Sequence, residues 1–232
     1  MTTDSPQQRY PALADAFGRL DRLQEQHQPL FIRLYAPGVS LFLPDLVIQG
    51  FLKRSLDTLT GILTLVSQWN FTAAGALLRV QLDSLLRVAY LGTIPALDRD
   101  RVCREILGGE SFNRIRGTDG RHLTDGRLRG VTEEQYPWLG SVYTETSKLI
   151  HFSDKHCFLT ARNPNEESRT VEFVFGTRHP EWSESGLREF LAATVHATDS
   201  LLRVVEAWAE AKERATRRTS HPPDVSPDEE DH

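Results

Sequence analysis

Charged side chains recur at helical spacing in residues 70–91 (NFTAAGALLRVQLDSLLRVAYL), a segment that is otherwise apolar. Arg79, Asp83 and Arg87 lie four residues apart, so Asp83 can pair with either arginine on one helix face. If one guanidinium is left free, its planar fork suits a phosphate or a carboxylate. The segment therefore predicts either a self-contained ion-pair network or an anion-binding surface.

A second polar strip lies in residues 138–154 (WLGSVYTETSKLIHFSD), where Tyr143, Ser147 and His151 follow one another at steps of four. His151 could act as a general acid or base, because the ordinary pKa of histidine is close to neutral. A histidine near a helix C-terminus is also favoured electrostatically without any catalytic role. Ser147 could pair with His151, but no hydrolase elbow accompanies it, so serine nucleophilic catalysis is the weaker interpretation.

The sequence contains no clear metal-binding or nucleotide-binding motif that would indicate a cofactor. His151 and Asp154 share a helix face, but His156 and Cys157 do not follow at zinc-ligand spacing. Neither a P-loop nor a Gly-x-Gly-x-x-Gly motif is present. We therefore predict no metal site and no cofactor.

Residues 108–130 are rich in glycine and arginine and poor in large apolar side chains. Two interpretations are open, a loop that contacts phosphate groups and a mobile surface loop, and we favour the second. The basic residues that the first interpretation would use are Arg114, Arg116, Arg121, Arg127 and Arg129.

Apolar periodicity predicts a mainly helical protein, an antiparallel bundle with one β-hairpin before its last helix. Residues 1–215 form the predicted domain, and the acidic tail 216–232 is predicted to be disordered. Pro29 is expected to end the first helix, Asn70 to cap the third, and Ser183 or Ser185 to cap the last. The predicted helices span residues 11–28, 43–69, 70–91, 95–107 and 183–215. A further helix is predicted after a capping box at Thr132 and Gln135, with Pro137 in its first turn and its end near residue 153. The predicted strands span 157–161 and 170–175.

Composition excludes several classes of protein. The 232 residues are 39% hydrophobic and 25% charged, which is typical of a globular domain. The net charge is −5, of which the tail contributes −3, so the nearly neutral body has no general basic footprint for nucleic acid. Two cysteines and the absence of a signal peptide or membrane-spanning segment predict a cytoplasmic protein.

The two strips carry a resemblance. The stretch Leu-Leu-Arg-x-x-x-Asp-Ser within residues 73–91, with Tyr143-x-x-x-Ser147-x-x-x-His151, resembles bacterial HEPN-like helical proteins over roughly residues 40–212. The resemblance implies a helical bundle, a homodimer and, in some relatives, metal-independent RNA cleavage in toxin–antitoxin or phage-defence systems. It also implies RNA or a nucleotide as ligand, and an antitoxin or defence protein as partner.

The HEPN-like nucleases use an arginine and a later histidine with four to six residues between them, and this chain departs from that pattern near His151. Arg22 with His27 and Arg116 with His122 fit the spacing, but neither pair lies on the two polar strips.

The two polar strips lead to two functional hypotheses. In the first, a cleft cleaves RNA with His151 as acid/base and Arg79 as the phosphorane-stabilising group, and the binding residues are Asp83, Arg87, Tyr143 and Ser147. In the second, the protein is a non-catalytic binding or regulatory module for a protein or a phosphate-containing ligand.

Overall fold

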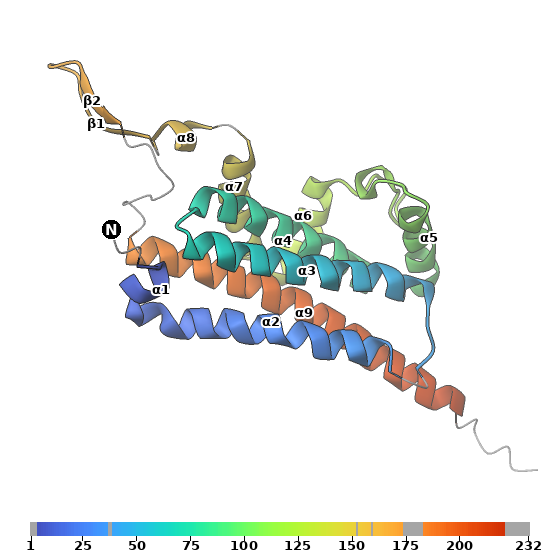
Figure 1. The fold of residues 1–232 in the computed structure, drawn as a ribbon. Coiled ribbons are helices and arrows are strands. Elements are labelled where there is room, and N and C mark those ends of the chain that lie inside the picture. Colours follow the sequence, from blue (N-terminus) through green and yellow to red (C-terminus); the bar gives the residue numbers. More distant parts are fainter. Residues whose placement is uncertain (1–3, 37–38, 152, 159, 174–182, 221–232) are drawn as a thin grey trace, which may run out of the picture.

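The structure is a computed structural model that describes residues 4–36, 39–151, 153–158, 160–173 and 183–220 (Figure 1). Four long helices form the bundle, and α4 packs against both α3 and α9. These helices are α2 (Ala14–Leu34), α3 (Leu43–Ser67), α4 (Phe71–Thr93) and α9 (Glu184–Ser220). The predicted mainly helical fold with one hairpin before the last helix is confirmed.

Shorter elements connect α4 to α9. Helices α6 and α7 pack against α4, and α5 packs against α3. Since this connection carries the chain back to the end where α2 begins, α9 runs parallel to α2 and α4, while α3 runs antiparallel to all three (Figure 1). The remaining helices are α1 (Pro6–Arg9), α5 (Ala96–Leu107), α6 (Asp125–Gln135), α7 (Leu139–Ile150) and α8 (Asp154–Phe158), with 3-10 turns at Pro11–Leu13 and Phe112–Arg114.

Two predicted helix starts are confirmed, and the predicted end of the first helix is wrong. The Asn70 side chain accepts a hydrogen bond from the Ala73 amide at 3.2 Å, and the Ser183 hydroxyl accepts one from the Gly186 amide at 3.1 Å. Pro29 does not end the first helix, because α2 continues through it to Leu34. Burial of two further leucines on the core face of this last stretch outweighs the local cost of the proline.

The glycine- and arginine-rich segment is folded, so its interpretation as a mobile loop is wrong. Phe112, Ile115, Leu123 and Leu128 anchor it in the core. A short antiparallel bridge joins Arg116 to His122, and α6 begins soon after, within the span that was expected to be loop. Four well-separated apolar side chains suffice to fix a segment whose average composition looks like a loop.

The hairpin pairs β1 (Ala161–Asn165) with β2 (Thr170–Phe173), so β1 begins four residues later than predicted. The preceding residues form α8 instead, and the hairpin projects from one end of the bundle (Figure 1).

The last helix is longer than predicted. Helix α9 continues to Ser220, so residues 216–220 of the predicted disordered tail are helical. Residues 221–232 lie outside the described residues, and no described helix is long and apolar enough to cross a membrane.

A buried ion pair fixes the end of α9. The Lys212 ammonium lies 2.7 Å from the Asp45 carboxylate, and it also donates to the Leu34 carbonyl at 2.7 Å. The same carboxylate accepts from the Trp208 indole and from the Phe42 amide, each at 2.7 Å. One carboxylate thus joins α9 to the start of α3, and Lys212 extends the connection to the end of α2.

We predict that Lys212→Met destabilises the protein by about 3–5 kcal/mol, because it leaves the Asp45 charge buried without its counter-ion. Urea unfolding measures the loss. Lys53→Met is the matched control, since Lys53 and Asp57 form an exposed ion pair on α3 whose removal should cost about 0–1 kcal/mol. Equal losses in the two variants would contradict the assigned role of Lys212.

Candidate functional site

Helices α4 and α7 bring five of the six predicted site residues together. Arg79, Asp83 and Arg87 lie on the face of α4 that meets α6 and α7, and Tyr143 and Ser147 lie on α7. Gly75 of α4 leaves room for the Leu149 side chain of α7, because a Cβ atom at this position would overlap the terminal methyl group of Leu149. The predicted helical spacing of both strips is confirmed for these residues.

The centre of the cluster is Asp125, the first residue of α6, which the sequence analysis missed. Its carboxylate accepts from Arg79 Nη2 at 3.1 Å and from Arg87 Nη2 at 2.9 Å. The Tyr143 hydroxyl donates to the same carboxylate at 3.1 Å. Three donors from two helices therefore converge on one anion from a third helix.

Asp83 completes the charge balance on α4. It accepts from Arg87 and from Arg54 Nη1 of α3, the latter at 3.1 Å, and it lies 3.8 Å from Arg79 Nη1. Both arginines of the strip are thus paired within the chain. The strip therefore forms an ion-pair network, and neither guanidinium is left without a carboxylate partner.

Tyr143 and Ser147 hold the Arg79 side chain in place. The guanidinium carbon lies 3.6 Å from the centroid of the Tyr143 ring, and Nε donates to the Ser147 hydroxyl at 3.3 Å. The Ser147 hydroxyl in turn donates to the Tyr143 carbonyl at 2.7 Å. Ser147 therefore orients an arginine, and its proton is bound to the backbone rather than to a general base.

His151 is the predicted site residue that the structure does not bring to the cluster. Helix α7 ends at Ile150, not near residue 153, and His151 follows in extended backbone with φ −95° and ψ 142°. Its side chain is exposed, and we find no hydrogen bond to it among the residues that the structure describes. The i+4 alignment expected for His151 is lost because the helix stops one residue too early.

The two pairs that match the nuclease spacing are also separated from the cluster. His27 is buried with both ring nitrogens hydrogen-bonded, whereas Arg22 is exposed. Arg116 Nη1 donates to a backbone carbonyl at 2.7 Å, and His122 Nδ1 lies 2.8 Å from another. Both members of the second pair thus stabilise the local turn.

The electrostatics of the cluster favour a charged carboxylate and a neutral phenol. Burial alone would raise the pKa of Asp125, but Arg87, the Tyr143 hydroxyl and Arg79 outweigh burial and lower it. Burial raises the pKa of Tyr143, and this effect exceeds the opposing influence of Arg79. Near neutral pH the phenol therefore donates a hydrogen bond to a charged carboxylate.

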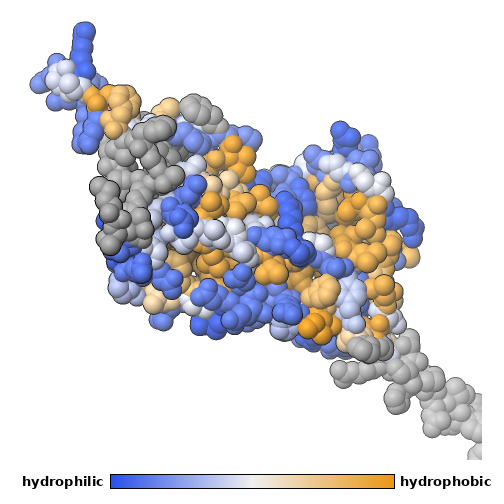
Figure 2. All heavy atoms as spheres, viewed as in Figure 1, coloured by the Kyte–Doolittle hydropathy of each residue, from blue (hydrophilic) through white to orange (hydrophobic). Residues whose placement is uncertain are grey.

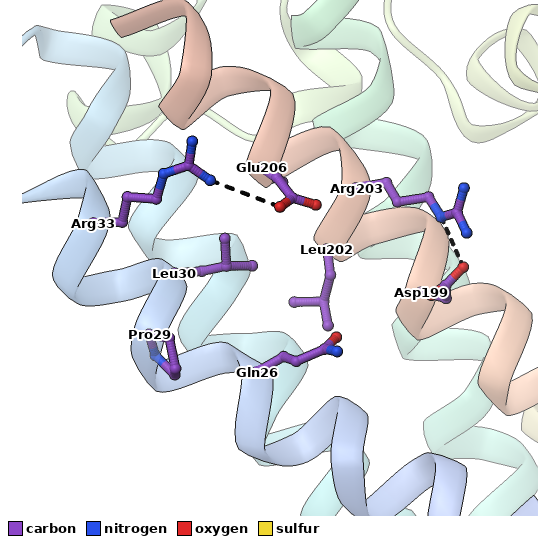
Figure 3. Close-up of a pocket in the computed structure, with 8 residues that line it drawn as sticks. All are labelled: Gln26, Pro29, Leu30, Arg33, Asp199, Leu202, Arg203 and Glu206. Carbon is purple, nitrogen blue, oxygen red and sulfur yellow. Dashed lines mark hydrogen bonds and ion pairs between the residues drawn. The ribbon is translucent and has the colours of Figure 1, made fainter. Parts of the chain in front are cut away.

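Two other features do not add to the site. Among the described residues, no three side chains of metal-ligating type come together. A groove of about 470 Å³ lies between α2 and α9, and its charged side chains are already paired, with Arg33 3.7 Å from Glu206 and Arg203 2.9 Å from Asp199 (Figure 3). The polar cluster thus remains the candidate site.

A scan against protein-family models finds no family that matches this chain, and searches of curated proteins and of solved structures find no match either. The HEPN-like resemblance therefore stays a prediction. The function of the cluster has to be inferred from its own geometry.

We predict that Asp125 makes stability depend on pH in the acid range. The pKa of the Asp125 carboxyl is lower in the folded chain than in the unfolded chain, where it is about 3.9. Above about pH 3.9 Asp125 contributes its full stabilisation of the folded protein, and this contribution is lost as the pH falls through the lower, folded-state pKa. Between about pH 5 and pH 3, urea unfolding of wild type should weaken more steeply than that of Asp125→Asn. Asp57→Asn, at an exposed site, should follow wild type, and parallel profiles for wild type and Asp125→Asn would contradict the prediction.

Proposed function

We propose that this protein is a non-catalytic helical binding module whose Arg79 and Arg87 bind the anionic group of a phosphate-containing ligand. The observation that carries the proposal is the convergence of three donors on the Asp125 carboxylate. In this interpretation Asp125 is a resident anion that holds the site until a ligand replaces it.

The gradient of exposure supports such an exchange. The side chains of Arg79 and Arg87 are 10% and 15% exposed, whereas that of Asp125 is 39% exposed. The cationic groups thus form a buried floor and the carboxylate lies nearer to solvent. An incoming anion would meet Asp125 first and could take over the same three donors, which suit phosphate oxygens in geometry.

Charge counting favours a phosphate over a second carboxylate. Arg54, Arg79 and Arg87 contribute three positive charges, and Asp83 contributes one negative charge that remains when Asp125 moves away. The vacated site would therefore carry a local excess of two positive charges. A phosphate group with a charge close to −2 matches this excess and has enough oxygens to contact both arginines.

Proton transfer is poorly supported by the same contacts. Among the described residues, the side chains that contact Arg79 are Asp83, Asp125, Tyr143 and Ser147, and none of them is a histidine that could act as a general base. Binding is therefore the better interpretation of the cluster. RNA cleavage, a homodimer and an antitoxin or defence-protein partner stay predictions from the resemblance.

Calorimetric titration with inorganic phosphate and pyrophosphate tests the binding proposal. Asp125→Asn removes the resident charge and should bind pyrophosphate about tenfold more tightly than wild type, because less of the site is occupied internally. Arg87→Gln should abolish saturable binding. Asp119→Asn is the control, since Asp119 lies on the same segment but pairs with Arg127. Equal affinities for the two aspartate variants would contradict the proposal.

Incubation of a mixed RNA with wild type and His151→Ala in the presence of a chelator tests the nuclease hypothesis. We expect no cleavage by either protein, and nearly unchanged stability of His151→Ala, because the His151 side chain is exposed. Chelator-resistant cleavage by wild type that is lost in a folded His151→Ala would overturn the non-catalytic proposal.

A further inference from the structure

A buried polar layer crosses the bundle at a site separate from the cluster. It consists of one side chain from each long helix: His27 from α2, Ser55 from α3, Gln81 from α4 and Thr198 from α9. All four are buried among apolar residues. Polar groups in such a position are costly unless they are hydrogen-bonded to one another, so the direction of each bond matters.

The contacts fix the protonation state of the imidazole. His27 Nδ1 lies 2.8 Å from the Leu23 carbonyl, which can only accept, so Nδ1 carries the proton. Nε2 lies 3.0 Å from the Ser55 hydroxyl and accepts from it. The Gln81 amide then donates to Ser55 at 2.7 Å and to Thr198 at 3.2 Å. His27 is thus neutral in this arrangement.

One acceptor of the layer is unused. Gln81 Oε1 is buried, and within the described part of the chain it has no hydrogen-bond partner. A half-turn of the amide would exchange the positions of Oε1 and Nε2. Oε1 would then face Ser55 and Thr198, so the layer has a second arrangement in which its bonds run in the opposite direction.

No charged side chain is bonded to the layer from any of the four helices, as far as the structure describes them. On α2, Arg19 faces Asp199 of α9, which also pairs with Arg203. On α3 and α4, Arg54 and Arg79 belong to the polar cluster. Burial lowers the pKa of His27 and outweighs the opposing effect of the neighbouring backbone carbonyls.

We propose that this layer is a proton-operated switch, in which protonation of His27 reverses its hydrogen bonds and loosens the bundle in mildly acidic conditions. A proton on Nε2 makes the imidazole a donor to Ser55, so the Ser55 hydroxyl must find another acceptor. The turned Gln81 amide supplies one through Oε1, and its NH₂ group becomes the unsatisfied group instead. The added charge stays buried among neutral partners, which weakens the folded state.

The sign of the pH dependence follows from linkage. Above about pH 6.5, the ordinary pKa of histidine, His27 is neutral in both the folded and the unfolded chain. Below it the unfolded chain binds a proton that the folded chain does not, so the folding equilibrium constant falls by up to tenfold per pH unit. The folding equilibrium constant stops falling once the pH is below the lowered pKa of His27 in the folded chain. This pH range lies above the range in which Asp125 titrates.

Urea unfolding of the full chain between pH 7.5 and pH 5 tests the proposal. His27→Gln retains a donor and an acceptor but cannot titrate, so it should lose the pH dependence that wild type shows. His122→Gln is the control, because His122 is exposed, and it should follow wild type. Parallel profiles for wild type and His27→Gln would overturn the switch.

A second variant tests the proposed reversal itself. Gln81→Glu places a carboxylate acceptor next to Ser55, which should favour charged His27 and make the chain relatively more stable at pH 5.5 than at pH 7.5. An unchanged slope would overturn the reversal. NMR titration of the His27 imidazole in wild type needs no variant: His27 should still be neutral where the stability begins to fall and should take up its proton only at lower pH. An imidazole that is already charged at the start of the fall would refute the proposal.

Discussion

The sharing of one carboxylate between two arginines whose side chains are largely buried is the interaction on which the middle of this structure depends. Arg79 and Arg87 are held on α4, the helix at the centre of the bundle, where unpaired guanidinium groups would be very costly. Asp83 alone cannot neutralise both. Asp125 supplies the second negative charge, and in doing so it fixes the start of α6 against α4 and sets the register of α7 through Tyr143.

Features that depend on neighbours in the sequence were predicted well. The i+4 steps of Arg79, Asp83 and Arg87 specify a shared helix face whatever surrounds it. Asn70 and Ser183 cap the helices that follow them, because a cap needs only its own side chain and an amide three residues later. The number and order of the long helices follow from apolar periodicity for the same reason.

Features that depend on residues far apart in the sequence were missed. Asp125 lies 46 residues from Arg79, and no local pattern links the two. The contact between Gln81 and Thr198 spans 117 residues, and that between Lys212 and Leu34 spans 178. The prediction for His151 failed for a different reason. Helix ends are decided by a few residues, and α7 ends three residues before the predicted end, which takes His151 off the helix face.

The parallel course of α9 gives the bundle an electrical polarity. Three of the four long helices begin at the end that carries the hairpin, and only α3 begins at the other, so their dipoles do not cancel (Figure 1). Each helix carries about half an elementary charge at either terminus, which leaves about one positive charge in excess at the hairpin end. Hydrophobic residues are visible over α5 at the opposite end, and others lie over the middle of the bundle (Figure 2). The long axis of the molecule is therefore also an axis of electrostatic potential, along which a charged molecule would be turned before it makes contact.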